Sequence, residues 1–371
     1  MTSVKNSFQR LYWIDRIKGV AILGIIVFHF FQIYPQSVPI IKTLDTHLPK
    51  VGFAMVDIFF LISGFNASYA LKKYDPSIQK AKNFWVTWLK KRLTKIYATY
   101  WLAIIYICLL TYIFNGTIKL NSLTDFFLIA IGFPSYDLFK LINPGFWFVS
   151  VIVQAYLLIP LLLSFTLKNP KKLLILGIVV SIINKLICFL LLLLYGNRSQ
   201  AYYFFLQTNF IGSYFFPLCL GLYWGIIFKR DGRFRRKDWW LSLIAFSLGI
   251  VWQLIILVNQ SNVRYKLGLD LLVVPLLTLI LYATFKTKNN SLFVKYIKQF
   301  MSYLGRNSYP IFLIHQPIFF LFLVFWQKTL GVDPYITIIL TAIAVSINLA
   351  LLLKLFIVID FYWTKLIKNY L

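Results

Sequence analysis

Long apolar runs recur along this chain, and short polar segments separate them. Ten of these runs are long enough to predict membrane-spanning helices. They cover residues 17–34, 52–71, 96–114, 146–166, 172–195, 206–228, 239–258, 267–285, 308–327 and 335–358. Segment 122–133 is also apolar but short, so we expect an interfacial or re-entrant helix there. The pattern predicts an all-α, polytopic transmembrane bundle that forms one domain over residues 1–371.

Positive charge alternates between the polar segments. The net charge is +27, and Lys and Arg concentrate in every second segment. Those segments are 5–18, 72–95, 168–172, 229–237, 286–306 and 365–368. By the positive-inside rule this alternation predicts that both termini are cytoplasmic. The basic segments should also attract anionic membrane lipids. We do not expect nucleic acid as a partner, because no basic stretch accompanies a soluble recognition fold.

Composition narrows the possible chemistry. Hydrophobic residues make up 60% of the chain, which excludes an ordinary soluble domain. All eleven acidic residues are aspartates, so few carboxylates are available for catalysis. The three cysteines have neither a disulfide nor a metal-site spacing, and we expect no metal.

Two basic residues in the first apolar segment are candidates for function. Lys18 and His29 are eleven residues apart, so they share one helix face at a separation of about 16 Å. Lys18 should lie at the membrane surface and His29 about half-way across. An ionisable group at that depth is a functional candidate, and imidazole is suited to proton transfer.

Two further ionisable residues are expected within spans. Asp57 descends from the outer side as His29 ascends from the inner side, so it could orient the imidazole; alternatively it caps or bonds a neighbouring helix. His315, between Pro310 and Pro317, is a second intramembrane histidine, although a lone buried histidine is more often structural.

Other candidates lie at the ends of two spans. Arg92 and Lys95 are one turn apart where the third span leaves the cytoplasm, and could hold a phosphorylated ligand. They could equally be topology signals. Trp147 is typical of an interface anchor. Gln154 and Tyr156 lie deeper, need polar partners, and could line a substrate cavity.

Taken together, these stretches resemble the acyltransferase-3 family of integral membrane acyltransferases. The similarity rests on five phrases in order: Lys18 with His29, Val56–Phe65, Lys91–Tyr100, Trp147–Pro160 and Leu304–Pro317. The chain departs from the family where lysine replaces a frequent arginine, at Lys18 and Lys95. It also lacks the glutamates that many members carry before Gln154.

The resemblance implies transfer of an acyl group, commonly acetyl from acetyl-CoA, to a hydroxyl of a bacterial cell-surface polysaccharide or its lipid-linked precursor. Lys18, Arg92, Lys95 and Arg306 would bind the phosphates of the coenzyme at the cytoplasmic membrane. His29 would act as general base or as transient acyl carrier. The alternatives are a transporter or flippase of lipid-linked sugars, and a non-catalytic scaffold. Against the flippase, we see no internal repeat.

Overall fold

The computed structural model is helical throughout its described residues, which are 10–33, 39, 49–71, 82–118, 120–166, 169–195, 210–258, 269–287, 291–324 and 334–370. Its longer helices are α1 (Tyr12–Ile33), α3 (Pro49–Tyr69), α5 (Lys82–Asn115), α8 (Trp147–Thr166), α9 (Lys171–Tyr195), α11 (Phe215–Asp231), α12 (Arg236–Val258), α14 (Val274–Lys286), α15 (Leu292–Arg306), α16 (Ser308–Val324) and α17 (Pro334–Tyr370). Short elements are α6 (Leu123–Ala130), α7 (Tyr136–Lys140), η1 (Pro144–Phe146), η3 (Ile211–Tyr214) and α13 (Leu269–Leu272).

Helices occupy all ten segments that the apolar pattern predicted as spans, and α6 lies within the short segment 122–133. Among the described residues, four helices are long and apolar enough to cross a membrane: Phe84–Asn115, Pro144–Thr166, Lys171–Tyr195 and Ile211–Asp231. Ala54–Tyr69, Val274–Lys286 and Ser308–Phe322 are shorter apolar helices. The chain is therefore a helical membrane protein, whereas ten spans and two cytoplasmic termini stay predictions.

Two predicted segments have different boundaries in the structure. Segment 267–285 divides into α13 and α14, because Pro275 stands at the start of α14 and cannot continue a preceding helix. Helix α5 begins at Lys82, well before the predicted 96. The basic stretch that precedes the apolar run is thus helical, which gives Arg92 and Lys95 fixed positions on α5.

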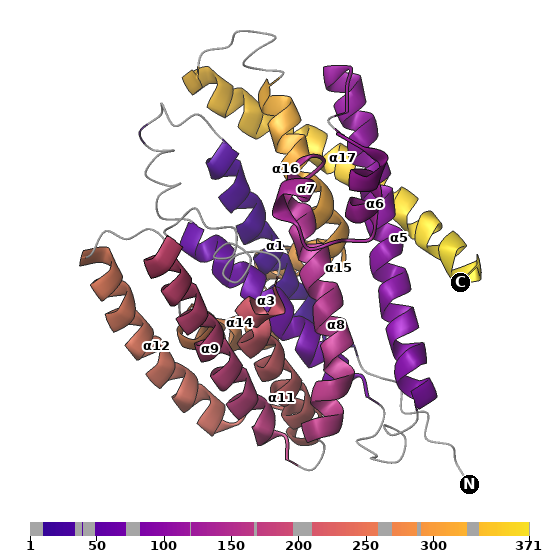
Figure 1. Ribbon diagram of the computed structural model, residues 1–371. Coiled ribbons are helices and arrows are strands. Elements are labelled where there is room, and N and C mark those ends of the chain that lie inside the picture. Colours follow the sequence, from indigo (N-terminus) through magenta and orange to yellow (C-terminus); the bar gives the residue numbers. More distant parts are fainter. Residues whose placement is uncertain are drawn as a thin grey trace.

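Helices α1 and α3 occupy the centre of the bundle (Figure 1). Helix α3 packs between α1 and α11, and α1 also packs against α14, α15 and α16. Helices α9 and α12 lie on one side of this centre, and α5 and α17 on the other (Figure 1). The central helices thus bring the beginning of the chain against its last third.

Helix α15 approaches α1 so closely that two glycines are required. A Cβ at Gly305 would collide with the backbone of Asp15, and one at Gly19 with the backbone of Met301. The opposite face of α15 is apolar and exposed, with Phe293, Tyr296 and Phe300 on it. The close contact fixes the end of α15, and with it Arg306, beside the start of α1.

We expect Gly305→Leu to destabilise the protein, because its side chain would force α15 away from α1. Inserted side chains in packed cores typically cost about 1–3 kcal/mol, and a clash with backbone should reach the upper part of this range. The thermal unfolding midpoint in detergent measures the effect. Phe300→Leu, on the exposed face of the same helix, is the matched control. Equal midpoints for the two variants would contradict this packing.

Candidate functional site

One cavity of about 190 Å³ is lined by all four cations that the sequence predicted to bind a phosphorylated donor. Lys18 comes from α1, Arg92 and Lys95 from α5, and Arg306 from α15. Tyr156 of α8, predicted to bind substrate, lines the same cavity. The fold therefore brings together side chains that are up to 288 residues apart in the sequence (306 − 18).

Positive charge exceeds negative charge around this cavity. Lys18 lies 3.3 Å from Asp15, but the same carboxylate also binds Arg10 at 2.7 Å. Within the described part of the chain, Arg92, Lys95 and Arg306 form no ion pair with a carboxylate. Because these cations outnumber the carboxylates near them, Asp15 and Asp360, they create a positive potential, and such a potential attracts polyanions.

Aromatic rings and a backbone carbonyl hold two of these cations. The Arg92 guanidinium lies 5.5 Å from the ring of Trp88 and 5.7 Å from that of Tyr156. Aromatic faces stabilise a guanidinium without neutralising its charge. Arg306 donates from Nε to the carbonyl of Ser302 at 3.2 Å, within its own last turn. Both cations thus retain N–H groups that can bind an anion.

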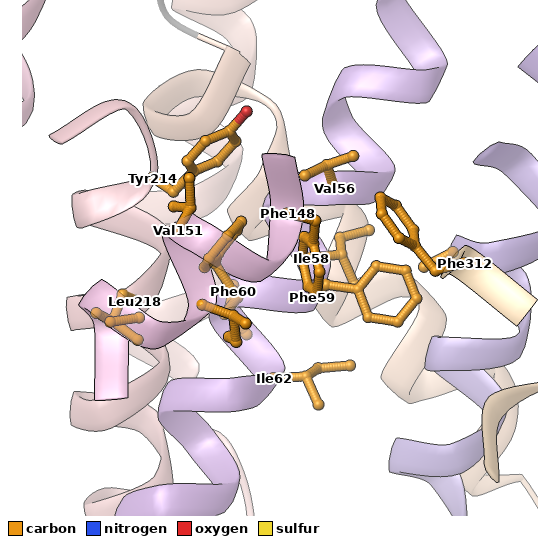
Figure 2. Close-up of a cluster of buried hydrophobic side chains, with 14 of the residues drawn as sticks. Val56, Ile58, Phe59, Phe60, Ile62, Phe148, Val151, Tyr214, Leu218 and Phe312 are labelled. Carbon is orange, nitrogen blue, oxygen red and sulfur yellow. The ribbon is translucent and has the colours of Figure 1, made fainter. Parts of the chain in front are cut away.

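The remaining walls are partly polar and partly aromatic. Ser63, Asn66 and Ser308 add small polar groups that the sequence did not single out; Ser63 and Ser308 lie within the family-like phrases, and Asn66 directly follows one of them. Phe59, Phe148 and Phe312 form an aromatic wall, with ring centroids 6.3 Å apart for Phe59–Phe148 and 4.6 Å for Phe148–Phe312. Figure 2 shows these three rings together in the buried cluster. The cavity is therefore cationic on one part of its wall and apolar on another.

The two predicted intramembrane histidines are neighbours. The ring centroids of His29 on α1 and His315 on α16 are 5.2 Å apart. Nδ1 of His29 lies 3.0 Å from Oε1 of Gln32, a partner that the sequence did not reveal. His315 is fully buried, and its Nδ1 lies 2.9 Å from the carbonyl of Phe312 and 3.1 Å from that of Ile311.

Phe312 stands between the cavity and this histidine pair. It lines the cavity, and its ring lies 5.8 Å from that of His315. Neither histidine belongs to the cavity lining. Phe312 is thus shared by the cavity and the surroundings of His315.

The structure does not bring Asp57 to the imidazole of His29. On α3, Met55 faces α1, since a Cβ added to Gly24 of α1 would touch the Met55 side chain, and Phe59 lines the cavity. Each residue advances about 100° around a helix, so Asp57 lies about 160° from both Met55 and Phe59. Its carboxyl group instead faces α9 and α13, where the charges acting on it are those of Asp270 and Lys185.

Those charges form a buried polar cluster, in which Asp270 accepts from two side chains of α9. Lys185 Nζ lies 2.8 Å from Oδ2 of Asp270, and Ser181 Oγ donates to the same oxygen at 2.7 Å. Lys185 also contacts Ser181 Oγ. The cluster joins α3, α9 and α13. This agrees with the alternative in which Asp57 bonds a neighbouring helix.

Trp147 and Gln154 contact η3 and not the cationic cavity. Trp147 stacks on Tyr214 with centroids 5.7 Å apart and planes at 17°. Its ring also packs edge-to-face with that of Phe312, with ring centroids 6.4 Å apart. Gln154 Oε1 accepts from the backbone N–H of Ile211 at 3.1 Å. Neither residue belongs to the lining of the cavity that Tyr156 lines.

The fold and cavity define a helical membrane protein with a cationic cavity and a pair of neighbouring histidines. The profile of the family described as "Acyltransferase domain" matches residues 11–355, and the chain belongs to this acyltransferase-3 family. It is 25% identical over 329 residues to "Putative O-acetyltransferase SACOL0978" of Staphylococcus aureus strain COL, covering 81% of this chain and 49% of that protein.

A second relative is "O-acetyltransferase OatA" of S. aureus strain NCTC 8325, which is 25% identical over 358 residues. The match covers 90% of this chain and 55% of the relative. The chain thus spans about half the length of the curated relatives that it matches. No solved structure matches the chain.

We expect the cavity to bind a small polyanion. Pyrophosphate should raise the thermal unfolding midpoint of the protein in detergent, and Arg92→Gln or Arg306→Gln should weaken its binding roughly tenfold or more, because each removes a charge-assisted hydrogen bond. Titration of the midpoint against pyrophosphate gives the affinities. Lys172→Gln, an exposed cation of α9 outside the cavity, is the control. An equal loss in all three variants would show that binding is not at this cavity.

Proposed function

We propose that this chain is a membrane O-acetyltransferase that transfers an acetyl group from cytosolic acetyl-CoA to a hydroxyl group of a bacterial cell-surface polysaccharide or its lipid-linked precursor. The observation that carries the proposal is the convergence of Lys18, Arg92, Lys95 and Arg306 on one cavity. Membership of an acyltransferase family and the names of the relatives support the class of reaction.

Coenzyme A matches the two parts of the cavity wall. Its diphosphate and ribose phosphate would bind the cations, since guanidinium and ammonium groups are effective phosphate ligands. Its long pantetheine arm would pass the aromatic wall and carry the thioester toward the histidines. Because Phe312 lies on that path, we expect this ring to move when the donor binds.

His29 would perform the chemistry. With Nδ1 of His29 donating to Oε1 of Gln32, Nε2 would keep its lone pair. That lone pair could remove the proton of an acceptor hydroxyl as the hydroxyl attacks the thioester, or could take the acetyl group itself. Both routes release coenzyme A as a thiol and leave the acetyl group as an ester.

The acceptor would approach from the side of Trp147 and Gln154. Aromatic rings and amide groups are suited to sugar faces and sugar hydroxyls, and both residues lie outside the lining of the donor cavity, with Trp147 against the ring of Phe312. Donor and acceptor would then meet at the histidine pair. In this account the protein lies in the bacterial cytoplasmic membrane with its donor cavity open to the cytosol.

We expect His29→Ala to abolish acetyl transfer without loss of donor binding, because it removes the base and leaves every cavity cation in place. General acid–base groups typically contribute about 10²–10⁴-fold to a rate. The measurement is acetate released by mild alkali from the surface glycans of cells that carry each variant. His47→Ala, at a position outside the described residues, is the matched control. Full acetylation in the His29→Ala cells would exclude the proposed role.

A separate assay distinguishes transfer from lipid-linked sugar transport. Purified protein mixed with its membrane acceptor should release the free thiol of coenzyme A from acetyl-CoA. A flippase would release none.

A further inference from the structure

We infer that His315 is a positioning residue that shares the catalytic proton with His29. This inference rests on the proposed function, because it concerns the proton that His29 removes from the acceptor. It starts from the hydrogen bonds of His315, which fix where its ring carries the proton.

The tautomer of His315 follows from its partners. Nδ1 faces the carbonyl oxygens of Ile311 and Phe312, and a carbonyl can only accept a hydrogen bond. Nδ1 therefore carries the proton, and Nε2 carries a lone pair. Nε2 is buried and has no hydrogen-bond partner among the described residues. An unpaired acceptor in an apolar interior is costly, so its retention needs an explanation.

The neighbouring ring supplies that explanation. The ring centroids of His29 and His315 lie 5.2 Å apart, and with Nδ1 donating to Gln32 the His29 ring has the same tautomer as His315. Two imidazolium rings this close would repel, so the pair holds one added proton at a time. With both rings neutral, each Nε2 carries a lone pair, so neither Nε2 can donate a hydrogen bond to the other.

The reaction supplies the missing donor. The acceptor oxygen attacks the thioester carbonyl carbon, a C–O bond forms, and the hydroxyl proton moves to Nε2 of His29. A rotation of the His29 ring then lets that N–H donate to the lone pair of His315 Nε2, which stabilises the imidazolium. The tetrahedral intermediate collapses, the C–S bond breaks, and the coenzyme A thiolate takes the proton from His29.

Among the described residues, no carboxylate takes the role that we assign to His315 beside His29. Asp57 lies on the far face of α3 and faces Lys185 and Asp270. Aspartate orients the imidazole in many hydrolases, but a buried anion here would need its own counter-charge. A neutral imidazole stabilises the transient cation without that cost. The pairing therefore suits a site inside a membrane.

The test uses inside-out membrane vesicles from the parent bacterium, with its own gene deleted and each variant supplied. Radiolabelled acetyl-CoA is the donor, and alkali-labile label in the glycan fraction is measured. We expect His315→Leu to lower the maximal rate about 10- to 100-fold, because a hydrogen bond to a charged group is lost. The KM for acetyl-CoA should not change. His315→Gln should recover most of the rate, since its amide oxygen can accept.

Controls separate this role from packing. Phe319→Leu alters a ring that contacts His315 but removes no nitrogen, and should keep the wild-type rate. If His315→Leu does not accumulate, His315→Met provides the same comparison. A wild-type rate in the apolar variant, or no recovery with Gln, would overturn the inference while leaving the proposed function intact. Absence of label with the wild-type protein would overturn both.

Discussion

Ionisable groups within a membrane bundle must have polar partners, since an uncompensated charge in an apolar interior is expensive. In this protein most such groups meet that requirement inside the fold. Lys185 and Asp270 bind each other, and Asp15 binds both Arg10 and Lys18. The cations around the cavity differ, because Arg92, Lys95 and Arg306 form no ion pair with a carboxylate in the described part of the chain. An anionic ligand that enters the cavity would supply the counter-charge, and this is the basis of the functional account.

Phe312 connects the three parts of the site. It lines the cationic cavity, contacts His315, and meets the edge of Trp147. One apolar side chain thus borders the cavity, His315 and Trp147. In the proposed reaction this ring would keep water from the thioester until both substrates are present, because it would turn only as the donor advances. Hydrolysis of the donor would then be suppressed in the absence of acceptor.

Much of the fold could be predicted from the sequence, because apolar runs of membrane-spanning length are a strong signal. The break between α13 and α14 follows from Pro275 and could also have been anticipated. The clustering of Lys18, Arg92, Lys95 and Arg306 was predicted from charge placement and the family resemblance, and the cavity brings all four together.

The remaining contacts depend on helix rotation and on distant packing. Asp57 was expected near His29 from depth alone, but depth does not say which face of α3 meets α1. The pairing of His29 with His315 joins residues 286 positions apart (315 − 29), and no local pattern reveals such a contact. Gln32 is one turn beyond His29 and could have been suspected from its i+3 spacing.

The most direct test of the account is a cryo-electron microscopy structure of the protein with coenzyme A bound. The account predicts density for the coenzyme phosphates against Lys18, Arg92, Lys95 and Arg306, with the pantetheine arm directed past Phe312 toward His29. Coenzyme density elsewhere on the protein, with this cavity empty, would contradict it.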